Sequence, residues 1–173
     1  MHRRQSLPRS WLFTDERMGE RLFGAIERLP HGAGLVFRHY ALPAEERRAL
    51  WERVRTAGRA KGLTLIAAGP ALPGADGCHN RSGAGIRTSS AHSLREIRAA
   101  ERAGADLIFL SPVFATSSHP GAQVLGPRRF ALLAHQTKVP VVALGGMDAA
   151  KARDLGGAHG WAGIDAWCEP AGA

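Results

Sequence analysis

The chain has 173 residues, of which 45% are hydrophobic and 22% charged, a composition typical of a folded globular domain and not of a disordered chain. Its length fits a single domain spanning residues 1–173. The formal net charge of +8 is spread along the chain without a basic tail, and the aromatic residues do not alternate with the arginines as a base-stacking surface requires. We therefore expect a solvated, arginine-rich surface, and the charge alone supports a nucleic-acid-binding domain only weakly.

Cysteine content and hydropathy indicate the cellular compartment. Cys78 and Cys168 are too few to form a disulfide framework in a chain of this length, which favours a reducing environment. No apolar run is long enough to cross a bilayer, and no apolar segment follows the basic residues at the amino terminus as it does in a secretory signal. These features predict a cytoplasmic protein with no membrane partner and no nucleic-acid partner.

Short apolar runs alternate with amphipathic stretches from one end of the chain to the other. Such runs predict strands, and two of them are continuous enough to be buried on both faces, as strands of parallel sheets are. Eight strands are predicted, at residues 11–14, 34–38, 63–68, 77–79, 86–89, 106–111, 139–144 and 160–164.

Helix signals lie between most of these strands. Amphipathic spacing predicts helices at 18–29 and 43–61, and another is expected through Phe130 and Leu133. Ser93 and Glu96 match a capping box for a helix that Gly104 ends, and Asp148 is expected to cap a short helix that Gly156 closes. Residues 69–85 hold too much glycine and proline for a long helix.

Eight strands with helices or loops between them predict an α/β fold, a small closed (β/α)8 TIM barrel. The helices between strands 3 and 5 are expected to be reduced and the final helix to be almost absent. An open, doubly wound sheet is the alternative, and the absence of a Gly-x-Gly-x-x-Gly motif after the first strand disfavours it.

Residues that suit phosphate lie where strands of such a barrel end. Active sites of this fold form at the carboxyl ends of the strands, and phosphate often binds after strands seven and eight. The loop at 116–119 offers hydroxyl groups and an imidazole, and Gly145 and Gly146 let the backbone approach an anion just before a helix. A plain strand-to-helix turn is the alternative interpretation of the two glycines.

Other side chains at these strand ends have two interpretations each. Arg38 either binds a ligand or forms an ion pair across the barrel mouth, since burying an unpaired arginine is costly. His79 and His92 are either acid–base groups or hydrogen-bonding residues. Asp15 is expected to be a cap or turn residue, and Cys78 a small core residue. No spacing of His, Cys and Asp predicts a metal site.

Several segments carry a family resemblance: Asp76–His79, Ser90–His92, Glu101–Asp106, Pro112–Thr116 and Pro140–Met147. With them the chain resembles thiamine-phosphate synthase and, equally, its thiazole-tautomerase relatives, from about residue 11 to residue 167 and most densely from Asp76 onward. The family fold is a small TIM barrel, in agreement with the strand count.

The resemblance implies a reaction and a set of site residues. Synthase members join a hydroxymethylpyrimidine pyrophosphate to a thiazole phosphate and release pyrophosphate with the help of Mg²⁺. The pyrimidine pyrophosphate would be lined by Arg38 and Ser90. The thiazole phosphate would be held by Thr116 and Ser118, with His119 at its edge and Gly145, Gly146 and Ile164 completing the cradle. Arg38, Ser90 and His119 are thus the predicted catalytic residues.

The chain departs from the family pattern at the polar positions of the site. Val36 and Tyr40 replace the glutamine and the lysine of the family's second-strand pattern, and His119 replaces a lysine. Asp165 stands where the family has a phosphate-binding serine, and a carboxylate there repels an anion unless it turns away, is protonated or pairs with a cation such as Arg38.

The remaining departures concern Mg²⁺ and the tautomerase activity. An Asn-Asp pair gives way to residues 67–70, and the second magnesium aspartate of the family falls near Ala84. Mg²⁺ is implied by the resemblance, yet its usual oxygen ligands are absent. Tautomerase relatives carry a catalytic histidine where this chain has Pro112, so the tautomerase is the less favoured activity.

These observations leave two leading functions. The first is a thiamine-phosphate-synthase-like transferase that acts on small phosphorylated substrates. The second is a non-catalytic or regulatory protein that binds thiamine-type phosphates, which the missing magnesium ligands favour. The thin helix cover at 69–85 would leave apolar surface for a second copy of the chain, so a homodimer is also expected.

Overall fold

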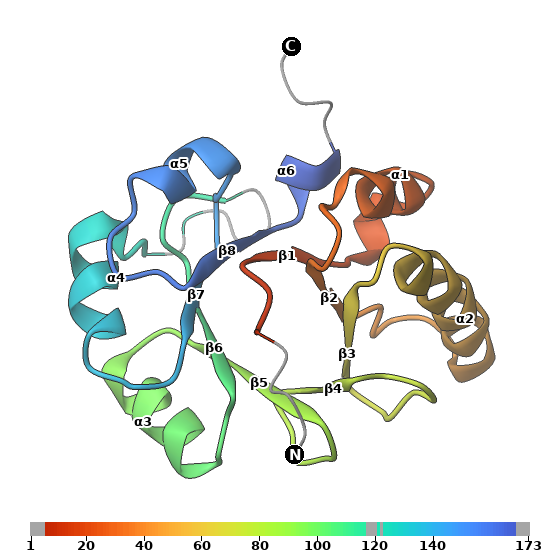
Figure 1. The fold of residues 1–173 in the computed structure, drawn as a ribbon, viewed down its shortest axis with the longest axis horizontal. Coiled ribbons are helices and arrows are strands. Elements are labelled where there is room, and N and C mark those ends of the chain that lie inside the picture. The colour runs from red at the N-terminus through yellow and green to blue at the C-terminus, as the bar shows by residue number, and fades with distance from the viewer. Residues whose placement is uncertain (1–5, 117–120, 122, 169–173) are drawn as a thin grey trace.

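The computed structural model describes residues 6–116, 121 and 123–168, which form a closed barrel of eight parallel strands in sequential order (Figure 1). The predicted α/β barrel is confirmed, and the open sheet is excluded because β1 pairs with β8 as well as with β2. The strands are β1 (Ser10–Phe13), β2 (Gly34–Phe37), β3 (Thr64–Ala68), β4 (Gly77–His79), β5 (Ile86–Ala91), β6 (Leu107–Leu110), β7 (Val141–Ala143) and β8 (Gly160–Gly163).

The helices lie outside the barrel and follow the predicted positions closely. They are the 3-10 turn η1 (Glu16–Met18), α1 (Arg21–Arg28), α2 (Ala44–Ala60), α3 (Leu94–Arg102), α4 (Gly126–Ala134), α5 (Ala149–Arg153) and α6 (Asp165–Cys168). None of the helices in the described ranges is long and apolar enough to span a bilayer.

The capping predictions hold at three helix starts. Ser93 accepts a hydrogen bond from the amide of Glu96, Asp148 accepts one from Lys151, and Asp15 caps η1 through the amide of Arg17. These side chains satisfy amides that lack a partner within the first helical turn. The strand expected at 139–144 is shorter than predicted, since β7 begins only after Pro140, which has no N–H to donate.

Large side chains fill the barrel interior, so the barrel has a packed core and no channel. Phe109 packs edge-on against Trp11 at 5.3 Å and against Phe13 at 4.7 Å between ring centroids. Gly34 is required beside them, because any Cβ at this position would collide with the Trp11 ring.

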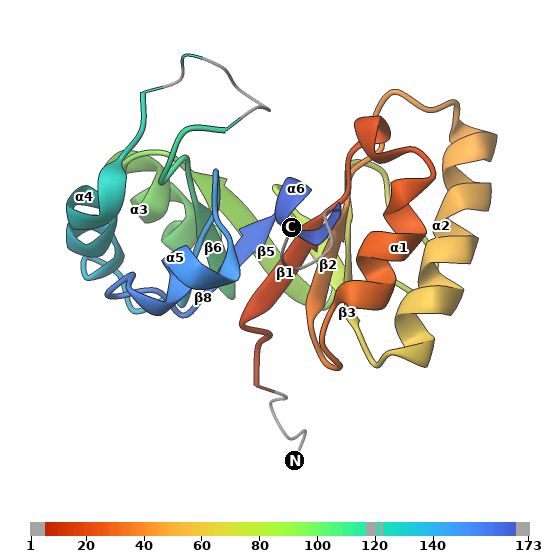
Figure 2. The same ribbon diagram turned by 90° about the horizontal axis from the view of Figure 1, so that it is seen from above.

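Helices α1 and α2 lie on one side of the barrel and α3, α4 and α5 on the opposite side (Figure 2), and a hydrophobic cluster packs between strands and helices on each side. The amino-terminal shell contains buried residues of α1, α2 and α6 against β1 to β3. The carboxyl-terminal shell contains those of α3 and α4 against β5 to β7, with residues beside α5.

The chain forms no helix between β3 and β4 or between β4 and β5, as predicted for residues 69–85 (Figure 1). The connection from β3 to β4 is instead held by polar contacts. Trp51 Nε1 donates to the carbonyl of Pro73 at 2.9 Å, and the Asp76 carboxylate accepts hydrogen bonds from Arg59 and from the amide of Leu65.

Candidate functional site

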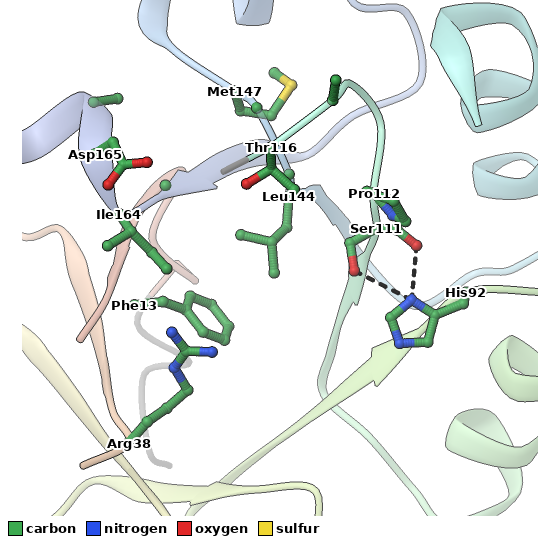
Figure 3. Close-up of a pocket in the computed structure, with 15 residues that line it drawn as sticks. Phe13, Arg38, His92, Ser111, Pro112, Thr116, Leu144, Met147, Ile164 and Asp165 are labelled. Carbon is green, nitrogen blue, oxygen red and sulfur yellow. Dashed lines mark hydrogen bonds between the residues drawn. The ribbon is translucent and has the colours of Figure 1, made fainter. Parts of the chain in front are cut away.

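A cavity of about 320 Å³ opens at the carboxyl ends of the strands (Figure 3). Five residues expected from the sequence line it together, although they come from four different parts of the chain: Arg38, Thr116, Gly145, Gly146 and Ile164.

Apolar side chains form most of the cavity wall. Phe13 comes from the end of β1, Leu144 and Met147 flank the end of β7, and Ile164 follows β8. Such a wall with a few polar groups suits a flat organic ring that carries polar substituents.

Arg38 is anchored at the cavity by the strand end beside it. Its Nε donates to the carbonyl of Thr14 at 2.9 Å, and its Nη2 donates to Asp15 at 3.1 Å. The guanidinium also lies 5.5 Å from the centre of the Phe13 ring, within the range of a cation–π contact. Nη1 makes no hydrogen bond within the described part of the chain. The predicted ion pair is therefore present, with Asp15 as the partner, and ligand binding through Nη1 stays a prediction.

Asp15 does more than cap a turn. Its carboxylate binds Arg17 through Nε at 2.8 Å and Nη2 at 3.1 Å, in addition to Arg38. The hydrogen bond from Arg17 is the largest influence and lowers the pKa of Asp15 to about 2. Sequence reasoning missed this role. The available signal was that Asp15 follows β1 just as Arg38 follows β2, and β1 and β2 are neighbours.

The two glycines that follow β7 form a turn which only glycine can make. Gly145 and Gly146 have φ angles of 93° and 60°, in the left-handed region. A Cβ at Gly145 would lie 2.7 Å from Pro112 Cα, and one at Gly146 would collide with the carbonyl of Ala115. Within the described residues, the amides of Gly145, Gly146 and Met147 donate no hydrogen bond. Three adjacent amides without partners at a cavity are suited to an anion.

The predicted phosphate loop is described only in part. Thr116 lines the cavity beside the diglycine turn. Ser118 and His119 lie outside the described residues, so their predicted roles stay predictions.

Ser90 lies apart from the cavity lining, in a hydrogen-bonded group at the ends of β4 and β5. The imidazole of His79 joins Ser90 Oγ at 3.0 Å and Thr88 Oγ1 at 2.8 Å, and Asn80 accepts from the Ser90 amide. Burial, and to a lesser degree the charge of Arg38, lowers the pKa of His79 to about 4. His79 is thus a neutral, hydrogen-bonded residue that fixes the Ser90 hydroxyl.

His92 lines the cavity from the wall opposite Arg38 (Figure 3). Its Nδ1 lies 2.8 Å from the carbonyl of Ser111 and 3.3 Å from the hydroxyl of the same residue. A carbonyl oxygen only accepts, so Nδ1 carries a proton.

Asp165 also lines the cavity, and its side chain is exposed. Of the alternatives named for Asp165, pairing with Arg38 is not the one that the structure shows, because Asp15 is the ion-pair partner of Arg38. The physical reason is strand order: Asp15 follows β1, which is adjacent to β2, whereas Asp165 follows β8 on the far side of β1. The nearby cation is Arg17, whose pKa is raised by Asp15 first and by the charge of Asp165 as well.

The described residues do not fit a magnesium site of the expected kind. They contain no group of three His, Cys, Asp or Glu side chains that could hold a metal ion. Asp165 is the carboxylate in the cavity lining, and Asp15 already binds two guanidinium groups. A hard cation prefers several oxygen ligands, which this wall does not supply.

Comparison with known proteins agrees with the fold. Residues 83–167 match the family model described as Thiamine monophosphate synthase. Over 82 residues the chain is 45% identical to "Putative thiamine-phosphate synthase 2" of Aquifex aeolicus, covering 46% of this chain and 44% of that protein. It is 38% identical over 80 residues to "Thiamine-phosphate synthase" of Chloroflexus aurantiacus, covering 44% of this chain and 37% of that protein. The matched segment is thus less than half the length of these curated relatives.

A solved structure extends the likeness over most of the chain. "Thiamine phosphate pyrophosphorylase from Pyrococcus furiosus" superposes with a TM-score of 0.76 at 25% identity, covering 91% of this chain and 85% of that one.

The fold and the site define a small α/β barrel with an anion-compatible cavity at the carboxyl ends of its strands. Within that class, the chain is similar to proteins named thiamine-phosphate synthase, in sequence from residue 83 to residue 167 and in fold over most of its length.

Proposed function

We propose that this protein is a transferase of thiamine biosynthesis that couples a hydroxymethylpyrimidine pyrophosphate to a thiazole phosphate and releases pyrophosphate. The observation that carries the proposal is the cavity at which Arg38, Thr116 and the diglycine turn meet. The similarity to proteins named thiamine-phosphate synthase supports it.

The thiazole phosphate binds at the diglycine turn in this proposal. The amides of Gly145 and Gly146 and the hydroxyl of Thr116 stabilise its phosphate, with Ser118 and His119 as further predicted contacts. The apolar wall from Phe13 to Ile164 packs against the rings. Arg38 and Ser90 bind the pyrimidine pyrophosphate. Arg38 pairs with its negative charge, and Ser90 contacts it from the edge of the site.

One observation favours a second candidate, a protein that binds thiamine-type phosphates without catalysis. The described part of the chain lacks the oxygen ligands of a magnesium site. Without another means of stabilising the departing pyrophosphate, a binding site of this shape would hold its ligands and not convert them.

Titration calorimetry and turnover together separate the two candidates. We expect thiazole phosphate to bind, and thiamine phosphate to form when both substrates are supplied with Mg²⁺ or with a chelator. Binding without product in either condition would favour the second candidate. A Thr116→Val variant should bind thiazole phosphate more weakly, since it loses one hydroxyl donor. Thr56→Val, on the exposed side of α2, is a matched control.

Two further features belong to the proposal. We expect a cytoplasmic location, in keeping with the small phosphorylated substrates. We also expect a homodimer, which light scattering after size-exclusion chromatography would detect by mass.

A further inference from the structure

Besides the amides of the diglycine turn, two side-chain nitrogen atoms at the cavity have no hydrogen-bond partner among the described residues. Nε and Nη2 of Arg38 donate hydrogen bonds to Thr14 and Asp15, and Nη1 donates to none of the described residues. Nδ1 of His92 donates a hydrogen bond to Ser111, and Nε2 has no partner among the described residues. Both side chains line the same cavity from opposite walls, and the uncommitted ring edge of His92 faces the side on which the Arg38 guanidinium lies (Figure 3).

The anchoring of His92 determines what its second nitrogen can do. Because Nδ1 donates to the carbonyl of Ser111, a neutral His92 has its lone pair on Nε2, and a protonated His92 has a donor there. The amide of His92 also donates to Glu96 at 2.7 Å, which fixes the backbone of the residue at the start of α3. A backbone carbonyl thus orients this imidazole toward the cavity, as a second residue orients the base in other acid–base sites.

We infer that His92 is a catalytic residue of the proposed transferase and acts as the general acid for the departing pyrophosphate. This inference rests on the proposed function. Arg38 Nη1 binds the pyrophosphate from one wall, and protonated His92 Nε2 donates to its bridging oxygen from the other. Together they supply the charge stabilisation for which the described residues provide no metal ligands.

The chemical step balances without an additional reactant. The bond between the pyrimidine methylene carbon and the bridging oxygen breaks, and its electron pair stays on that oxygen. The thiazole nitrogen forms the new bond to the methylene carbon. The proton on His92 Nε2 moves to the departing oxygen, and His92 becomes neutral until it takes a proton from water after the products leave.

Two substitutions at His92 separate proton transfer from hydrogen bonding. In the His92→Asn variant, the side-chain amide can still donate to Ser111 but has no atom at the position of Nε2, and we expect kcat to fall at least about 100-fold. His92→Gln can reach the position of Nε2 with a hydrogen bond but carries no transferable proton. It should keep KM near that of the parent and lose kcat. His31→Gln, in an exposed loop away from the cavity, is the matched control.

A second experiment varies the basicity of the leaving group. The pyrimidine substrate is prepared with methylenediphosphonate and with the less basic difluoromethylenediphosphonate as leaving groups, and kcat is measured for the parent and for His92→Asn. A general acid assists the more basic leaving group most, so the ratio of the two rates should widen at least about tenfold in the variant. An unchanged ratio, or full activity in a folded His92→Asn protein, overturns the inference while the proposed function stands.

Binding of inorganic pyrophosphate by the parent, by Arg38→Gln and by His92→Asn tests the anion site without turnover. Weaker binding in both variants supports the pairing of the two walls, and unchanged binding in both overturns it. A parent that binds pyrophosphate but forms no thiamine phosphate overturns the proposed function and the proton-transfer step with it.

Discussion

Arg38 and Asp15 form an ion pair of 3.1 Å that joins the carboxyl ends of β1 and β2. The same carboxylate binds Arg17, so one acidic group holds two guanidinium groups at the barrel mouth. Since Nε of Arg38 is fixed on the Thr14 carbonyl as well, the remaining Nη1 has a defined direction toward the cavity. Arg38 is half-buried and ion-paired, and this arrangement is compatible with a role in binding a ligand.

The first prediction concerns the shape of this guanidinium. Arg38→Lys keeps the charge but cannot satisfy Thr14, Asp15 and a ligand at once, because an ammonium lacks the planar fork. We expect the KM for the pyrimidine pyrophosphate to rise about 10- to 100-fold, as the loss of a charged hydrogen bond of about 1.5–3 kcal/mol implies. Steady-state kinetics measure it, with Arg48→Lys on the exposed face of α2 as control. An unchanged KM would show that Nη1 binds nothing.

The second prediction concerns acid stability. The pKa of Asp15 is lowered to about 2, chiefly by the hydrogen bond from Arg17, so its ion pairs stabilise the folded state at pH values above the unfolded pKa. That contribution is lost as the pH falls from about 4 to about 2. In denaturant titrations, the unfolding free energy of Asp15→Asn should therefore fall less steeply than that of the parent over this window. Equal slopes would contradict the assignment.

A third prediction covers the next pH window. Burial lowers the pKa of His79 to about 4, so the unfolded chain takes up a proton at a higher pH than the folded protein does. The folded state should lose stability as the pH falls from about 6.5 to about 4. His79→Gln should flatten this part of the profile, although its stability at pH 7 falls by about 1–3 kcal/mol through lost hydrogen bonds to Thr88 and Ser90. A profile as steep as that of the parent would mean that another group titrates there.

The fourth prediction concerns the diglycine turn. Gly146→Ala places a Cβ at a φ of 60° and against the carbonyl of Ala115, at a cost of about 1–3 kcal/mol. The turn must shift to relieve the contact, so binding of thiazole phosphate should weaken along with the melting temperature. Gly156→Ala is the matched control, since a Cβ there meets nothing within 4 Å. Calorimetry that shows tight binding to a folded Gly146→Ala protein would rule out the amides of this turn as the phosphate site.

The hydrophobic pattern predicted the barrel well because most strands are short, apolar and followed by a turn or a cap. Ser93 and Asp148 mark helix starts as their residue types suggest, and the glycines and prolines of 69–85 exclude a helix over β4. These are local signals, and local signals are what one sequence carries most directly.

The polar part of the site was harder to predict because it depends on which strand ends are neighbours. Asp15 was expected to be a cap, which it is, but its ion pair with Arg38 spans 23 residues of sequence and exists only because β1 lies beside β2. The hydrogen bond from His92 to Ser111 likewise joins residues at the ends of β5 and β6. Neither contact has a spacing that marks it in the sequence.

The uncovered β4 has a consequence for how the two shells are connected. Trp161, which packs against the carboxyl-terminal shell, stacks at 4.7 Å on Trp167, which packs against the amino-terminal shell. The outer hydrophobic layer therefore does not close around the barrel. The stacked tryptophan pair joins the two shells beside β8, and no helix joins them along β4. The segment that matches the family model begins at residue 83, just after β4. The match therefore includes the helices of the carboxyl-terminal shell and leaves out α1 and α2 of the amino-terminal shell. Loop residues take the place of a helix along β4, since all of β4 is buried and Leu72 and Ala75 of the preceding connection pack against the amino-terminal shell.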